Sequence, residues 1–139
     1  MSRKRSRSRL IVLFVVALVA GVLLRLWLLP PTISLTAVEV KFLGAWDVVN
    51  QTDQSSLLWR FDRERKVVVL QKDADATYRE LWTGRWQVRD KEMELSNITA
   101  VQGLSMRPTA NYTIQFADTP DMVSWKDVNG VQFRASKSR

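Results

Sequence analysis

The chain has 139 residues, six tryptophans, no cysteine and no histidine, and a formal net charge of +7. Without cysteine and histidine it has no disulfide framework, no Cys/His zinc site, and no cysteine nucleophile or histidine base. Of its 21 basic residues six lie in residues 1–31, while the other 15 share residues 32–139 with all 14 acidic residues. That near-neutral part lacks the charge of a nucleic-acid-binding domain, so we expect no nucleic-acid partner.

The amino-terminal segment has the features of a membrane anchor. Five basic residues lie in a tail at residues 1–9, and an apolar stretch follows at 10–29 with Arg25 as its only charged residue. At about 1.5 Å per residue, a helix of this length spans roughly 30 Å, the thickness of a bilayer's hydrocarbon core. The positive-inside rule places the tail in the cytoplasm. Arg25 can extend its side chain to the headgroups, and Trp27 stands where an interfacial aromatic residue is expected.

A cleaved signal peptide is the competing interpretation of this segment. The apolar run Leu10–Leu24 already fills the longest usual hydrophobic region of a signal peptide, and Leu35-Thr36-Ala37 is a poor match to a cleavage site. We therefore expect an uncleaved, single-pass signal anchor in the cytoplasmic (inner) membrane. A short linker at 30–35, stiffened by two prolines, would then lead to an extracytoplasmic domain at 36–139.

Residues 36–139 alternate between apolar and polar side chains. This period of two predicts antiparallel strands with one apolar face. The alternating apolar positions are Val38, Val40 and Phe42; Trp46 and Val48; Leu57, Trp59 and Phe61; Trp82, Trp86 and Val88; Met93 and Leu95; Tyr112, Ile114 and Phe116; Val123 and Trp125; and Val131 and Phe133. A further strand is predicted at Lys66–Gln71, and a longer loop with room for a short helix at Ser96–Ala110.

The last hairpin allows its register to be predicted. A three-residue turn, Val128-Asn129-Gly130 with Gly130 in the left-handed conformation, pairs Trp125 with Phe133 and Ser124 with Arg134, which separates apolar from polar side chains. With about eight short strands at regular spacing, the predicted fold is all-β: a small antiparallel meander that forms a barrel or a sandwich. Closure into a barrel would remove the exposed strand edges.

One stretch of the chain resembles a known family. Phe42-Leu43-Gly44-Ala45-Trp46 opens the domain, Trp59-Arg60-Phe61-Asp62 leads a hairpin, and Thr83-Gly84-Arg85-Trp86-Gln87-Val88 runs into Asp90-Lys91-Glu92-Met93-Glu94-Leu95. Over about residues 42–96 this order resembles the small bacterial lipocalin-like (calycin-type) domains. The resemblance implies an antiparallel barrel built around an interior, and it implies no specific ligand.

Five tryptophans of the domain fall on the apolar phase of their predicted strands. They are Trp46, Trp59, Trp82, Trp86 and Trp125. They are the candidate ligand-binding residues if the barrel holds an aromatic-lined cavity. The alternative is that they fill the core, because a barrel of this size has little room inside. We expect Trp82 to lie nearest a mouth of the barrel.

Paired acidic residues are the other candidates for catalytic or metal-binding groups. Asp73 and Asp75 share a loop, Glu92 and Glu94 share a strand face, and Asp118 and Asp121 flank a proline. A glycosidase needs two carboxylates that face one cleft, and a calcium site needs several converging oxygens. Alternating strand phases favour a solvated face instead, so we expect no catalytic residue, no metal and no cofactor.

The sequence therefore predicts a non-enzymatic binding or interaction module of the cell envelope. Its partners would be the lipid bilayer, through residues 10–29, and either a small apolar ligand in its interior or an envelope protein across its surface. Two alternatives remain open. One is an accessory subunit of a membrane complex that acts through its anchor, with Arg25 paired to an acidic residue of a neighbouring helix. The other is a carboxylate-dependent hydrolase of envelope glycans or lipids.

Overall fold

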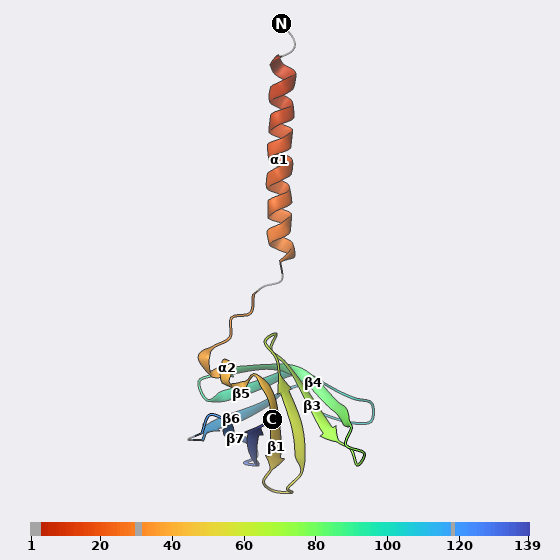
Figure 1. Ribbon diagram of the computed structural model, residues 1–139, viewed down its shortest axis with the longest axis vertical. Helices are drawn as coiled ribbons and strands as arrows, with labels where there is room; N and C mark the ends of the chain where they lie inside the picture. Colours follow the sequence, from red (N-terminus) through yellow and green to blue (C-terminus); the bar gives the residue numbers. More distant parts are fainter. Residues whose placement is uncertain (1–3, 30–31, 118) are drawn as a thin grey trace. The chain divides into compact units, whose positions relative to one another are not determined.

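The computed structural model describes residues 4–29, 32–117 and 119–139, with side chains from Phe14 onward. The chain divides into two compact units, Met1–Ile33 and Ser34–Arg139. The first contains the long helix α1 (Lys4–Leu28) (Figure 1). Every residue of the hydrophobic core cluster belongs to the second unit, which is the expected property of a domain that folds alone.

Helix α1 covers most of the predicted anchor. All of its described side chains, from Phe14 to Leu28, are exposed, and Trp27 is 90% exposed. The predicted membrane segment begins at Leu10, and the side chains of residues 10–13 lie outside the described part of the chain. Within the described part, no helix reaches the length and apolarity needed to cross a membrane. The transmembrane anchor therefore stays a prediction.

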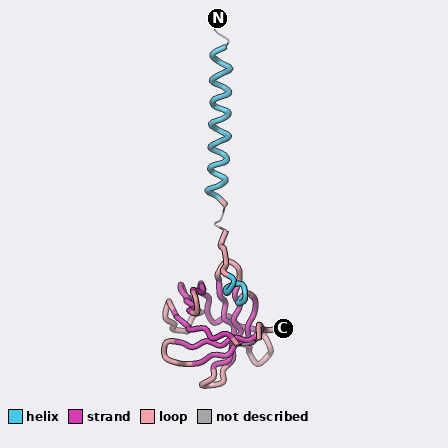
Figure 2. Tube along the Cα trace, turned by 90° about the vertical axis from the view of Figure 1, so that its left-hand side faces the viewer, coloured by secondary structure: helices cyan, strands magenta, loops and turns pink. Residues whose placement is uncertain are grey.

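The second unit is a closed antiparallel barrel in which each strand pairs with its neighbours in the chain and the last strand pairs with the first. It is all-β, as predicted, and of the two predicted architectures the barrel is the one observed (Figure 2). This architecture is compatible with a lipocalin-like fold. The strands are β1 (Gly44–Asn50), β2 (Ser56–Phe61), β3 (Lys66–Lys72), β4 (Tyr78–Arg89), β5 (Glu92–Ala100), β6 (Ala110–Phe116), β7 (Met122–Asp127) and β8 (Gln132–Lys137).

The predicted register of the last hairpin is confirmed. Trp125 pairs with Phe133 and Ser124 with Arg134. Gly130 has a φ of +87°, a left-handed conformation that glycine adopts without strain. The predicted long loop at Ser96–Ala110 is only partly correct, because β5 continues to Ala100 and the connection to β6 is shorter. Apolar and polar side chains alternate only weakly at the end of β5, so the sequence pattern did not show where this strand ends.

The first predicted strand of the domain is wrong. Val38, Val40 and Phe42 belong to a short helix, α2 (Ala37–Phe42), rather than to a strand. The reason is local: the Thr36 hydroxyl accepts a hydrogen bond from the Glu39 backbone N–H, and the Glu39 carboxylate accepts one from the Thr36 backbone N–H. This reciprocal pair is a capping box, which satisfies backbone donors that a helix start leaves free.

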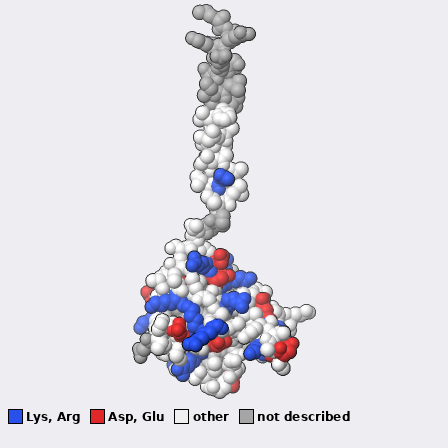
Figure 3. All heavy atoms as spheres, viewed as in Figure 1, with Lys and Arg blue, Asp and Glu red and all other residues white. Residues whose placement is uncertain are grey.

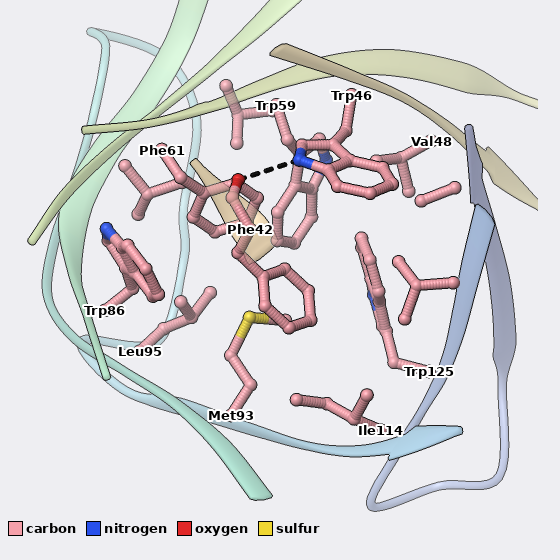
Figure 4. Packing of buried hydrophobic residues seen from close by; sticks show 14 of the residues in the cluster. Phe42, Trp46, Val48, Trp59, Phe61, Trp86, Met93, Leu95, Ile114 and Trp125 are labelled. Carbon is pink, nitrogen blue, oxygen red and sulfur yellow. Dashed lines mark hydrogen bonds between the residues drawn. The ribbon is translucent and has the colours of Figure 1, made fainter. Parts of the chain in front are cut away.

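Phe42 extends from the end of α2 into the centre of the barrel (Figure 4). Its ring centroid lies 5.8 Å from that of Phe61 and 6.4 Å from those of Trp86 and Trp125. Only 1% of Phe42 is exposed. A residue from outside the sheet therefore fills the space that the strands enclose, and burying a side chain of this size contributes about 2 kcal/mol or more.

Glu39 fixes α2 against the barrel. Its side chain is fully buried, and the Val88 backbone N–H donates a 3.1 Å hydrogen bond to Oε1. The Arg65 guanidinium forms an ion pair with Oε2 at 2.9 Å. Burial raises the pKa of this carboxyl, but the backbone hydrogen bonds from Thr36 and Val88 and the contact with Arg65 together outweigh burial and lower the pKa below its usual 4.5. The buried carboxylate is therefore charged at neutral pH and fully paired, as a buried charge must be.

Replacing this carboxylate should destabilise the barrel in a pH-dependent way. A carboxyl whose pKa is lowered by folding stabilises the folded state above its unfolded pKa, and loses that contribution as the pH falls through its folded pKa. We expect Glu39→Gln to lower the free energy of unfolding by about 2 kcal/mol at neutral pH, because charge-assisted hydrogen bonds are lost. The difference from the unsubstituted protein should shrink in acid. Urea denaturation at several pH values measures it.

The exposed Glu64, in the turn between β2 and β3, provides the matched control. Glu64→Gln removes the same charge from the same end of the barrel and should leave the free energy of unfolding within about 0.5 kcal/mol of its original value. Equal effects of the two substitutions would show that the Glu39 network contributes nothing specific.

Candidate functional site

The strand order gives the barrel two different ends. At one end α2 meets the β2–β3 turn, the β4–β5 turn and the β6–β7 loop; we call this the α2 end. At the other, the far end, lie the β1–β2, β3–β4, β5–β6 and β7–β8 connections. Basic and acidic side chains are interspersed over the face of the barrel shown in Figure 3. That face shows no block of one charge, and the hollows of the surface are the candidate sites.

The five predicted tryptophans all lie in one core cluster, and each is at most 5% exposed. Trp59 packs edge-on against Trp82, with ring centroids 5.2 Å apart, and Trp125 lies 5.4 Å from Trp59. Trp86 packs edge-on against Phe61 at 5.1 Å. The structure thus brings together all five residues that the sequence singled out, in contacts typical of a packed aromatic core.

The tryptophans differ in whether their indole N–H group donates a hydrogen bond. Trp46 donates a 2.7 Å hydrogen bond to the backbone oxygen of Phe42, which ties β1 to α2 (Figure 4). The indole nitrogens of Trp59, Trp86 and Trp125 are buried and have no hydrogen-bond partner among the described residues. An unpaired buried donor costs free energy of folding. At these three positions the packing of a large side chain therefore outweighs the cost of an unpaired indole N–H.

A groove opens at the α2 end, between α2, β1 and the β6–β7 loop. We call it the α2 groove. It encloses about 310 Å³, and Ala117 and Thr119 lie along its loop side. Its apolar walls are Phe42, Trp46, Phe116, Pro120, Met122 and Val123.

Position and exposure distinguish the walls of the α2 groove. Phe42 and Trp46 reach it from the core, whereas Phe116 is 46% exposed at the end of β6. The Lys41 ammonium lies 5.5 Å above the Phe116 ring, at the range of a cation–π contact. The groove therefore combines apolar walls, which include three aromatic residues, with one cation.

A smaller hollow of about 190 Å³ lies at the far end, which we call the far hollow. Trp82, Met106, Tyr112 and Val128 are among the residues that line it. Trp82 thus lies beside a surface hollow at the far end, as Trp46 lies beside the groove at the α2 end. Burial, and secondarily the negative charge of Asp127, raise the pKa of Tyr112 to about 12.

The paired acidic residues are engaged in local structure. Asp75 caps its own loop by accepting hydrogen bonds from Thr77, and these bonds lower its pKa. Glu92 accepts a hydrogen bond from Thr113, across to the next strand. Asp118, the predicted partner of Asp121, lies outside the described residues. Over the part of the chain that is described, no three potential metal-ligating side chains gather in one place.

Sequence reasoning did not find the α2 groove. Lys41 and Phe42 were assigned to a strand, and the β6–β7 loop was treated only as a turn. The Thr36-x-x-Glu39 pattern was the signal that could have placed a helix start there, because it is the sequence signature of a capping box.

No family model matches the chain, and no curated protein matches it. The functional assignment consequently rests on the geometry of the site.

The raised pKa of Tyr112 provides a direct measurement of burial at the far hollow. The chain has two tyrosines, so Tyr78→Phe leaves Tyr112 as the only one. We expect this tyrosine to ionise at about pH 12. Near-ultraviolet absorbance, recorded after a rapid pH jump, measures the ionisation. Asp127→Asn, which keeps a side-chain oxygen for the turn, should lower that pKa. Ionisation near the ordinary value of 10.0 would show that Tyr112 is solvated instead.

Proposed function

We propose that this protein is a membrane-tethered, non-enzymatic binding module whose α2 groove takes a small apolar ligand. The observation that carries the proposal is the groove itself. Its volume of about 310 Å³ falls at the lower end of the range for small-molecule sites, which are concave, mostly apolar and supplied with few polar groups.

The arrangement of the walls supports an apolar ligand. Phe42 and Trp46 are held rigidly, because the Trp46 indole N–H bonds to the Phe42 backbone and both rings belong to the core. A ligand that covers Phe116 would remove from water an aromatic face that is now partly exposed. Such burial is worth roughly 25 cal/mol per Å² of apolar surface, before the cost of immobilising the ligand.

The tether is the second part of the proposal. A basic tail precedes an apolar stretch of sufficient length, and the described part of that stretch, Phe14–Leu29, exposes large apolar side chains. Apolar surface on that scale is typical of a segment that meets lipid or another protein. Such a tether would hold the barrel at the outer face of the cytoplasmic membrane, with residues 1–9 in the cytoplasm.

Filling the groove should abolish ligand binding without unfolding the barrel. Ala117 is exposed on the loop side of the groove, so Ala117→Trp places an indole in it at little structural cost. We expect the unit Ser34–Arg139 to bind N-phenylnaphthylamine, a neutral apolar dye that fluoresces when desolvated. Ala117→Trp should weaken this binding roughly tenfold, the equivalent of about 1.4 kcal/mol.

The matched control is Val128→Trp, which adds the same side chain at the far end, where Val128 is 75% exposed. This variant should bind the dye as the unsubstituted unit does. Loss of binding only in Val128→Trp would assign the ligand to the far hollow. Absence of dye binding in the unsubstituted unit would contradict the proposed function.

The tether is tested on the full chain in a bacterial host. We expect the protein to remain in the membrane fraction after an alkaline wash, since an anchor that spans the bilayer is not released by removing surface charge. Replacing Leu18 and Val22 together by arginine should move the protein to the wash, because each buried arginine costs roughly 3 kcal/mol at the centre of a span. Release of the unsubstituted chain by the wash would contradict the tether while leaving the groove untouched.

A further inference from the structure

Two lysine ammonium groups stand over aromatic rings of the α2 groove. Lys41 lies 5.5 Å from the ring centroid of Phe116, and Lys137 lies 5.5 Å from that of Trp46. The two lysines come from α2 and from the end of β8: Lys41 lines the groove itself, and Lys137 lines the hollow next to it.

Neither lysine has a carboxylate within ion-pair distance among the described residues, where the ion pairs are those of Arg65 with Glu39 and of Arg79 with Asp73. Glu39, the acidic residue nearest in sequence to Lys41, is buried and neutralised by Arg65. Both ammonium groups are therefore held by aromatic faces, a contact worth only about 0.5–1 kcal/mol at an exposed site.

The hollow beside the groove supplies the other charges in the neighbourhood. Lys137 and Arg139 line it, together with Asp47 and Asp121, and Met122 borders both hollows. With Lys41 counted, the described side chains at this edge of the groove carry three cations and two carboxylates, while Asp118 of the β6–β7 loop lies outside the described residues. An anion that approaches the aromatic walls meets the ammonium groups of Lys41 and Lys137, which form no ion pair with a described carboxylate.

We propose that the α2 groove binds a single-chain amphiphile with an anionic head, a carboxylate or a phosphate. This inference rests on the proposed function and names the chemical class of its ligand. The apolar chain lies along Phe42, Phe116 and Met122, and the head contacts the ammonium groups of Lys41 and Lys137. Lysine side chains are suited to this role, because their flexible stems cover apolar surface while the ammonium reaches the head.

The charge of the head should contribute measurably to affinity. A charge-assisted hydrogen bond from an ammonium to a carboxylate is about twice as strong as a neutral one. Neutral and anionic amphiphiles of the same chain length therefore separate the contributions of the chain and of the head to affinity. The affinity of the neutral amphiphile measures the apolar contact with the groove. The difference in affinity between the anionic and the neutral amphiphile measures the contribution of the lysines.

The experiment measures the binding of decanoate, decyl phosphate and decanol to the unit Ser34–Arg139 by calorimetry, below the concentration at which the anions form micelles and below the solubility limit of decanol. We expect both anions to bind about tenfold more tightly than decanol. Lys41→Gln and Lys137→Gln should each weaken the binding of the anions severalfold and affect the binding of decanol much less. Lys126→Gln, at an exposed lysine of β7 away from the groove, is the matched control and should change none of the three.

The possible outcomes distinguish this inference from the proposed function. Equal binding of decanol and the anions, with no effect of the lysine variants, would overturn the inference and leave an apolar groove. Failure of all three amphiphiles to bind would overturn both.

A parallel sedimentation with vesicles of anionic phospholipid separates a free amphiphile from a lipid surface. The unit should stay in solution. Co-sedimentation without decanoate binding would show that the lysines meet a bilayer instead, which overturns the inference.

Discussion

The burial of one carboxylate organises the α2 end of the barrel. Glu39 has no exposed surface, and its oxygens accept hydrogen bonds from the Thr36 backbone, the Val88 backbone and the Arg65 guanidinium. Each partner comes from a different part of the chain: the cap of α2, the end of β4 and the β2–β3 turn. A buried charge with all partners in place has one low-energy arrangement, so α2 has one position on the barrel.

That position determines both the core and the groove. Because Glu39 fixes the position of α2, it also fixes the directions of the two residues at the end of this helix. Phe42 enters the barrel, and Lys41 stays at the surface above Phe116. Phe42 thus contacts the aromatic rings of the core, whereas its neighbour Lys41 contacts an aromatic ring at the surface. Packing, which needs Phe42, and the proposed recognition of an anion by Lys41 depend on the same six-residue helix.

The all-β meander was predictable from the sequence because its strands alternate with a period of two, and alternation is a local property; it left open whether the meander forms a barrel or a sandwich. The predicted pairing of Trp125 with Phe133 was confirmed because a glycine turn and the apolar phase agree on one register. The helix was not predicted, because Val38, Val40 and Phe42 have the spacing of a strand over a length too short to show a period of 3.6. In so short a segment the capping box decides the structure, and it is carried by only two side chains, Thr36 and Glu39.

The groove could not be predicted for a different reason. Its walls come from α2, β1, the β6–β7 loop and β7, which are far apart in the chain, and its shape depends on where a loop lies over a helix. Composition and periodicity contain no information about such a tertiary contact between a loop and a helix. The burial of the five tryptophans, by contrast, follows from strand phase alone and was expected, whereas their detailed packing around Phe42 was not.

Closure of the sheet has a consequence for how the barrel opens. The ladder between β1 and β8 pairs Trp46 with Lys137, and the Ser138 backbone N–H donates to the Ala45 oxygen at 2.9 Å. A ring of strands has no free edge from which fraying can start, so separating any one strand breaks two ladders at once. Amide hydrogens in all strands should therefore exchange with solvent through one shared, cooperative opening, instead of in a graded series from edge to centre.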